Sequence, residues 1–282
     1  MSTDELRVTL VQADTIWHDP SANRERLARL LQEGNQATDL IVLPETFTTG
    51  FSNEAVATAE SMEGETVAWM RAQSVSLDAA ITGSVQIRAG DQVFNRLLWA
   101  MPDGTLLHYD KRHLFRMAGE HKRYAAGGDR LLVDFRGWRI CPLVCYDLRF
   151  PVYSRNRFDR SRAGELDYDL LLFVANWPAP RHEVWRTLLR ARAIENLCYV
   201  AGVNRVGTDG NGLPHRGASA LIDSTGQPVV ECGEAPQVAR ATISRERLRE
   251  HRRRFPAHLD ADGFELDAVA DPAANDHHLR HG

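Results

Sequence analysis

The chain has 282 residues, and 34 Lys and Arg against 38 Asp and Glu give it a formal net charge of −4. Hydrophobic residues make up 43% and charged residues 26%, which excludes a disordered chain and is typical of a soluble globular protein. No apolar run approaches the ~20 residues of a membrane-spanning helix, no signal peptide is visible, and a mildly acidic chain binds nucleic-acid phosphate poorly. We therefore expect a cytoplasmic protein with no nucleic-acid or membrane partner.

The first part of the chain alternates strand and helix patterns. Ser21 is placed to cap the first predicted helix. The run before Pro44 is solidly apolar, which predicts a strand that is buried on both faces. The predicted elements are strands over 6–11, 39–43 and 80–87 and helices over 21–34 and 64–77.

The remainder of the chain adds hairpins to this alternation. Turn signals at 102–104, 136–137 and 223–226 each lie between two strand patterns. The predicted elements are hairpins over 93–109, 131–144 and 218–230, strands over 170–175 and 198–203, and helices over 184–197 and 245–254. Because strands and helices interleave without a linker or repeat, we expect one mixed-sheet α/β domain. The helix over 245–254 is rich in arginine, but its interspersed acids predict a solvated helix rather than an anion-binding patch.

Three chemically reactive side chains follow predicted strands. Glu45 comes after LIVLP, Lys111 after LLHYD and Cys145 after ICPLV. Each alone is more typical of a loop or surface residue. Catalytic groups of α/β proteins gather beyond the carboxyl ends of strands, so their common placement favours a shared site.

Cys145 is the candidate nucleophile, because its strand turns abruptly before Pro151 and such a turn exposes a side chain. A free thiol has a pKa of ~8.5, so it needs a nearby base or cation to react at neutral pH. Glu45 would supply the base and Lys111 the cation, if the fold brings them together. The other cysteines, Cys141, Cys198 and Cys232, have neither redox nor zinc-site spacing and are predicted to be packed thiols.

Three motifs resemble the signatures of the nitrilase superfamily of carbon–nitrogen hydrolases, in the family's order. They are Leu-Pro-Glu45-Thr-Phe, Tyr-Asp-Lys111-Arg-His-Leu-Phe and Val-Cys145-Tyr-Asp-Leu-Arg-Phe-Pro. The segments Phe-Arg-Met-Ala-Gly-Glu120, Ala-Asn176-Trp-Pro and Arg-Ala-Arg-Ala-Ile-Glu-Asn196 further resemble the ω-amidase branch. The resemblance covers about residues 5–260 and leaves 261–282 as a C-terminal tail.

The resemblance implies a fold and a site. The fold would be a single-domain, four-layer α-β-β-α sandwich that pairs through outer helices as a homodimer. The catalytic residues would be Glu45, Lys111 and Cys145, with Glu120 as an additional glutamate, and no metal or cofactor would be needed.

The implied reaction is hydrolysis of the ω-amide of a small keto acid, such as α-ketoglutaramate or α-ketosuccinamate, through a Cys145 thioester. Such a substrate carries an α-carboxylate, which guanidinium groups match in geometry. The backbone N–H of Tyr146 would help Lys111 stabilise the oxyanion. The predicted substrate-binding residues are Phe47, Arg116, Tyr146, Arg149, Asn176, Trp177 and Arg181.

Other interpretations remain open at this point. One alternative is a different member of the superfamily, such as a nitrilase, carbamoylase or aliphatic amidase. A cysteine–histidine hydrolase would use His113 or His121, and a non-enzymatic binding protein would retain the scaffold without the reaction. The terminal His277, His278 and His281 would bind metal only adventitiously.

Overall fold

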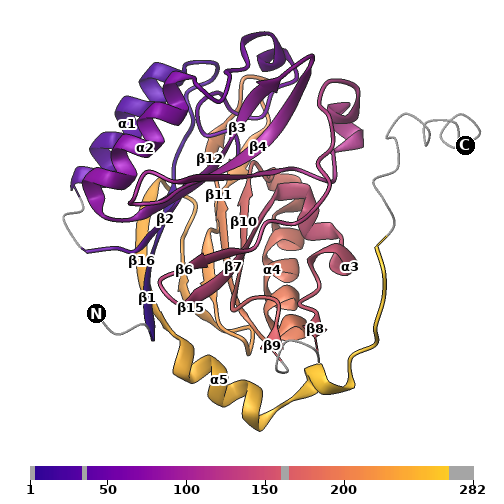
Figure 1. Cartoon of the computed structure of the whole chain (residues 1–282). Helices are drawn as coiled ribbons and strands as arrows, with labels where there is room; N and C mark the ends of the chain where they lie inside the picture. The colour runs from indigo at the N-terminus through magenta and orange to yellow at the C-terminus, as the bar shows by residue number, and fades with distance from the viewer. Residues whose placement is uncertain (1–3, 34–36, 160–164, 267–282) are drawn as a thin grey trace, which may run out of the picture.

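The computed structural model describes residues 4–33, 37–159 and 165–266. Within these residues, two six-stranded sheets pack face to face (Figure 1). The first sheet has the order β16 (Gln237–Ser244), β1 (Glu5–Gln12), β2 (Leu40–Val42), β3 (Ala80–Ala89), β4 (Gln92–Ala100), β5 (Leu106–Asp110). The second has the order β15 (Pro228–Glu231), β14 (Ala220–Ile222), β11 (Tyr199–Asn204), β10 (Leu170–Ala175), β7 (Trp138–Val144), β6 (Val133–Phe135).

Each sheet is parallel at its centre and antiparallel at its edges. In the first sheet, β2 pairs in parallel with both β1 and β3, and β4 and β5 follow as antiparallel neighbours. In the second sheet, β10 pairs in parallel with both β7 and β11. The carboxyl ends of β2, β5, β7 and β10 are therefore the points from which the chain can deliver side chains to a common site.

Apolar side chains from both sheets fill the space between them. Leu10 and Trp99 of the first sheet and Leu143 and Val203 of the second are fully buried in this central core. Side chains alternate along a strand, so Ile41 in β2 points to the opposite, outer face and belongs to a separate cluster. Strands that are covered on both faces explain the unbroken apolar runs of the sequence.

Helices cover the outer faces and complete four layers (Figure 1). The helices α1 (Pro20–Glu33) and α2 (Glu65–Leu77) lie on the first sheet, where Leu27 and Met70 are buried. The helix α4 (His182–Asn196) covers the second sheet and packs closely, because a Cβ added at Gly202 of β11 would lie 2.5 Å from Leu189. The remaining helices are the short α3 (Pro151–Ser154) and α5 (Arg245–Arg254). The α-β-β-α sandwich predicted for this chain is thus its fold.

Two short two-stranded ribbons complete the strands of the described residues. They pair β8 (Phe158–Asp159) with β9 (Glu165–Leu166), and β12 (Val206–Thr208) with β13 (Pro214–Arg216). Neither was predicted from the sequence. No helix among residues 4–33, 37–159 and 165–266 is long and apolar enough to cross a bilayer.

The predicted hairpins are confirmed with shifted ends, and the arginine-rich helix over 245–254 is confirmed, but one prediction is corrected and one strand was missed. The first helix begins at Pro20, and Asp19 rather than Ser21 accepts the N-terminal hydrogen bond, from the Ala22 N–H at 3.0 Å. The strand β16 was missed. Of the predicted tail, 261–266 has no helix or strand, and His277, His278 and His281 lie outside the described residues.

Candidate active site

Glu45 follows β2 after Leu43 and Pro44, and its side chain is completely buried. Oε1 accepts hydrogen bonds from Asn95 Nδ2 at 2.8 Å and from Lys111 Nζ at 2.9 Å. Oε2 accepts from the backbone N–H of Asn176 at 2.8 Å. Hydrogen-bond donors on both oxygens fix the orientation of the carboxyl group.

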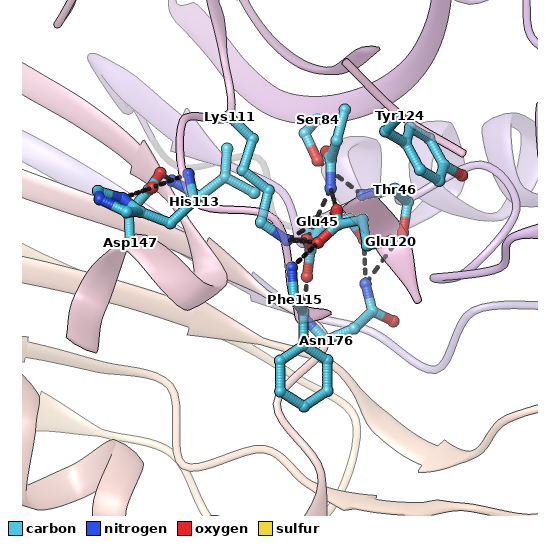
Figure 2. A network of polar contacts seen from close by, with 12 residues as sticks. Glu45, Thr46, Ser84, Lys111, His113, Phe115, Glu120, Tyr124, Asp147 and Asn176 are labelled. Atoms are coloured by element: carbon cyan, nitrogen blue, oxygen red, sulfur yellow. Dashed lines mark hydrogen bonds and ion pairs between the residues drawn. The ribbon is translucent and has the colours of Figure 1, made fainter. Parts of the chain in front are cut away.

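Lys111 follows β5 and brings its ammonium group to the same point (Figure 2). Its backbone is held on both sides, because its N–H donates to the Asn95 carbonyl and its own carbonyl accepts from the Gly127 N–H, each at 3.0 Å. Nζ lies 3.0 Å from each carboxylate oxygen of Glu120, in addition to its contact with Glu45. The lysine thus connects two carboxylates.

The charges of this cluster control its protonation. Burial alone would lower the pKa of Lys111, but the carboxylates of Glu120 and Glu45 outweigh it and raise this pKa well above the ordinary value. The ammonium is therefore retained throughout the neutral range. Burial also raises the pKa of Glu120, and Glu45 adds to the rise, whereas Lys111 opposes it.

Cys145 begins a 3₁₀ turn, 145–149, directly after β7. Its φ of +43° lies in the left-handed region, which marks the sharp turn predicted from the sequence. The thiol lines a cavity. Burial raises its pKa well above the ordinary value, the negative charge of Glu45 and a hydrogen bond to it raise it further, and Lys111 partly offsets both. The resting group is therefore a thiol, and it needs a base to become a nucleophile.

Asp147 connects this turn to the segment that carries Lys111. Its buried carboxylate accepts from the Val144 N–H at 3.0 Å and from the Tyr109 hydroxyl at 2.8 Å. It also accepts from the His113 N–H at 3.0 Å and lies 2.7 Å from the His113 ring nitrogen Nδ1. These hydrogen bonds therefore join the Cys145 turn to the segment that carries Lys111.

The two histidines of the rival scheme lie elsewhere. The His113 ring stacks on Phe150 with 3.7 Å between centroids and faces Asp147, as Figure 2 shows. Neither His113 nor His121 is among the described residues that line the cavity with Cys145. The side chains beside the thiol are those of Glu45 and Lys111, so the geometry opposes a Cys145–histidine pair.

A cavity of about 340 Å³ opens above these groups. This volume lies at the lower end of the range that is typical of small-molecule binding sites. Its described lining comprises Glu45, Phe51, Ser52, Asn53, Lys111, Phe115, Ala118, Cys145, Tyr146, Arg149, Asn176, Trp177, Pro178, Arg181, Asp209, Asn211, Leu213 and His215.

Five of the predicted substrate-binding residues line this cavity: Tyr146, Arg149, Asn176, Trp177 and Arg181. The two arginines lie over aromatic rings. The guanidinium carbon of Arg149 is 5.2 Å from the Trp177 ring centroid, and that of Arg181 is 5.3 Å from the Phe115 centroid. Such contacts orient a cation without neutralising it.

Phe47 and Arg116 were also predicted to bind substrate, and the structure places both outside the cavity lining. Phe47 is buried in the outer core, with its ring centroid 6.0 Å from that of Trp69. The φ of +42° at Thr46 breaks the alternation that would have put Phe47 on the same side as Glu45. Arg116 begins a 3₁₀ turn, 116–118, and Ala118 of that turn faces the cavity instead.

Sequence reasoning missed several residues of the site. Asn95, on β4, donates to both Glu45 and Glu120, but it stands beside Arg96 in a strand of mixed polarity, so no local pattern singled it out. His215, on β13, lines the cavity. Burial and the nearby charge of Arg205 lower the pKa of His215 to about 4, so this ring is neutral at physiological pH.

Paired sheets between helices, with a buried glutamate–lysine pair beside a cysteine at a strand end, define a hydrolase of the nitrilase superfamily. The chain belongs to the carbon-nitrogen hydrolase family, whose sequence pattern matches residues 7–253. It is 52% identical over 268 residues to the omega-amidase YafV of Yersinia enterocolitica, with 94% of this chain and 100% of that protein covered.

Two further relatives agree with this assignment. The chain is 30% identical to the 2-oxoglutaramate amidase of Bacillus subtilis, with 90% of this chain and 96% of that protein covered. The crystal structure of XC1258 from Xanthomonas campestris, a CN-hydrolase superfamily protein with an arsenic adduct in its active site, superposes with a TM-score of 0.92. Identity to XC1258 is 62%, over 93% of this chain and 99% of that one. The protein is therefore a carbon–nitrogen hydrolase that acts on amides.

Proposed function

We propose that the protein is an ω-amidase that hydrolyses the terminal amide of small keto-acid amides, such as α-ketoglutaramate and α-ketosuccinamate. The observation that carries this proposal is the pair Arg149 and Arg181. Both line the cavity that contains Cys145, and neither forms an ion pair with an acidic side chain in the described part of the chain. Unpaired guanidinium groups in a small cavity favour a substrate with a carboxylate. The similarity to the omega-amidase and the 2-oxoglutaramate amidase supports the same substrate class.

In the first stage, Glu45 takes the proton of the Cys145 thiol, and the sulfur attacks the carbon of the substrate amide. The charge that develops on the amide oxygen is stabilised by Lys111 and by the backbone N–H of Tyr146, in the first turn after the strand. One well-placed donor of this kind contributes ~3 kcal/mol, or a factor of 10²–10³ in rate. Glu45 then returns its proton to the leaving nitrogen, and ammonia departs as the C–N bond breaks.

In the second stage, the Cys145 thioester is hydrolysed. Glu45 takes a proton from water, the hydroxide adds to the thioester carbon, and the C–S bond breaks to release the carboxylic acid. The thiolate recovers the proton from Glu45. Glu120 would act on Lys111, because its two oxygens hold the ammonium beside Glu45.

The test is a substrate panel with coupled detection of ammonia. We expect α-ketoglutaramate and α-ketosuccinamate to be hydrolysed with a higher kcat/KM than butyramide, N-carbamoyl amines and aliphatic nitriles. Cys145→Ser should lose turnover. A preference for nitriles or carbamoyl amines would assign the chain to another activity of the superfamily, and full turnover by Cys145→Ser would reject the nucleophile.

We also propose that two chains pair as a homodimer through their outer helices and that the enzyme acts in the cytoplasm. On α4, Ile194 is 52% exposed, although it is a large apolar side chain. Light scattering coupled to size exclusion would give the mass in solution, and a monomeric mass at micromolar concentration would contradict the pairing.

A further inference from the structure

The indole of Trp17 packs against two glycine backbones. A Cβ added at Gly50 would lie 2.8 Å from Cε3 and Cζ3 of the indole. A Cβ added at Gly210 would lie 2.2 Å from Nε1 and 2.4 Å from Cδ1 and Cε2. These distances are shorter than real Cβ contacts, so both segments approach the ring more closely than any other residue type allows.

Both glycines belong to segments that line the cavity. Gly50 directly precedes Phe51, and Gly210 lies in the turn between β12 and β13, whose Asn211 and Leu213 also face the cavity. Leu213 is 37% exposed, so this turn forms the outer rim rather than the floor. Trp17 itself does not line the cavity.

The segment that carries Trp17 is anchored to the same two parts of the chain. The His18 N–H donates to the Thr49 carbonyl at 3.0 Å, next to Gly50. On the other side, the Val206 N–H donates to the Ala13 carbonyl at 3.1 Å. The backbone on both sides of Trp17 is therefore hydrogen-bonded to the two parts of the chain that the indole contacts.

The turn has its own internal structure but limited support from the sheets. Asp209 Oδ1 accepts from the N–H groups of Asn211 and Leu213, each at 2.9 Å, and the Gly212 N–H donates to the Asp209 carbonyl. The ribbon of β12 and β13 is a separate two-stranded sheet. The indole contact at Gly210 is thus a point at which this preformed turn is held in place over the cavity.

We propose that Trp17 is a positioning residue that fixes the 209–213 turn against the 50–53 segment and thereby sets the width of the cavity at its outer end. When its amide carbon lies at Cys145, a substrate reaches the outer end of the cavity only if its carbon chain is long enough. Trp17 would therefore control the binding of the distal part of the substrate and not the reaction at the thiol. The functional part of this inference rests on the proposed ω-amidase activity, whereas the structural part does not.

The structural test is hydrogen exchange, followed by mass spectrometry, in Trp17→Ala and Gly210→Ala. The first variant removes the ring, and the second forces the ring and the turn apart. We expect the peptide that contains 207–216 to exchange at least about 10-fold faster in both variants, because exchange follows local opening. Trp17→Phe should restore most of the protection. The matched control is Gly233→Ala, where an added Cβ meets nothing within 4 Å.

The functional test compares α-ketoglutaramate with butyramide, which has an amide but no distal carboxylate. In both variants we expect KM for α-ketoglutaramate to rise about 10-fold, equivalent to ~1.4 kcal/mol, with kcat within about twofold of wild type. For butyramide, kcat/KM should stay within about twofold. An equal loss on both substrates would overturn the positioning role.

The outcomes separate the two proposals. Unchanged exchange of the 207–216 peptide in both variants would overturn the contact proposed for Trp17, whatever the substrate of the enzyme is. A wild-type enzyme that does not hydrolyse α-ketoglutaramate would instead overturn the proposed activity. Thermal melting of each variant would show whether the protein remains folded in these measurements.

Discussion

The backbone N–H of Asn176 donates a 2.8 Å hydrogen bond to Oε2 of Glu45, and the Asn176 side-chain amide donates to the Glu45 carbonyl. Glu45 follows β2 of the first sheet, and Asn176 follows β10 of the second. This pair therefore joins the two sheets at the carboxyl ends of their strands. It also leaves the carboxylate with one orientation, in which Oε1 faces Lys111.

Replacing Glu45 with Gln should lower the pKa of Cys145 while nearly abolishing amide hydrolysis. Burial raises this thiol pKa most, but the charge of Glu45 raises it further, and the substitution removes that charge. We expect the pH midpoint of Cys145 alkylation by iodoacetamide to move to lower pH. The kcat for amides should fall by about 10²–10⁴, the usual contribution of a general base. Mass spectrometry of the alkylated protein gives the midpoint.

The exposed Glu63→Gln is the control for that experiment, and it should titrate like wild type. A midpoint at or above the wild-type value in Glu45→Gln would show that the glutamate charge does not act on the thiol.

Gly127→Ala should displace Lys111, whereas Gly128→Ala should not. An added Cβ at Gly127 would lie 2.0 Å from the Asp110 carbonyl oxygen, and the Gly127 N–H bonds the Lys111 carbonyl. At Gly128, an added Cβ meets nothing within 4 Å. We expect kcat to fall at least about 10-fold in the first variant and stability to fall by about 1–3 kcal/mol, the range for overpacking a close contact.

Steady-state kinetics and urea unfolding of these adjacent variants measure both effects. Equal kcat and equal stability of the two variants would contradict the expected displacement of the Lys111 ammonium.

The stability difference between wild type and Glu120→Gln should depend on pH. The pKa of Glu120 is raised from 4.5, by burial and then by Glu45, against the opposing effect of Lys111. A carboxyl whose pKa is raised on folding contributes stability below its unfolded pKa and loses that contribution as pH rises through the folded value. The free energy of unfolding of wild type should therefore fall relative to the variant as pH increases above about 4.5.

Urea unfolding of both proteins between acidic and neutral pH measures this difference, with Glu63→Gln as a surface control. A difference that grows in favour of wild type with increasing pH would indicate that the Lys111 ion pair outweighs burial at Glu120.

Arg149→Met and Arg181→Met should raise KM for keto-acid amides without changing kcat/KM for butyramide. A hydrogen bond to a charged group contributes ~1.5–3 kcal/mol, so each loss should raise KM about 10–100-fold. Lysine should rescue each site only in part, because it lacks the planar fork. Arg254→Met, at a side chain that is 79% exposed, serves as the control. Unchanged KM in the double variant would reject the carboxylate site.

Much of the fold could be predicted because its strands are buried on both faces. The runs that became β2 and β10 are apolar without interruption, and turn residues delimit the hairpins. In contrast, β16 was missed because only Ala239 and Ile243 of its residues are buried and the remainder are polar or partly exposed. Its place is decided by pairing with β1, which no local pattern reveals.

The residues of the site likewise include some that the sequence predicts and some that it does not. Glu45, Lys111 and Cys145 follow recognisable strands, so the sequence indicated where to look. Asn95 acts only through a side chain that meets Glu45 across 50 residues of chain, and such a contact leaves no local signature. Phe47 was misplaced because the left-handed backbone of Thr46, a residue type that rarely adopts it, reverses the direction of the next side chain.

The pairing of β16 with β1 joins the last strand of the described residues to the first, with Glu5 opposite Ser244 and Gln12 opposite Gln237. During translation, β1 therefore emerges early and keeps an unpaired edge until almost the whole chain has been synthesised. An unpaired strand edge of this kind can pair with another chain, and β16 removes that exposure when it pairs with β1. A chain that ended before Gln237 would still contain Glu45, Lys111 and Cys145, but its first sheet would lack the strand that covers the outer edge of β1.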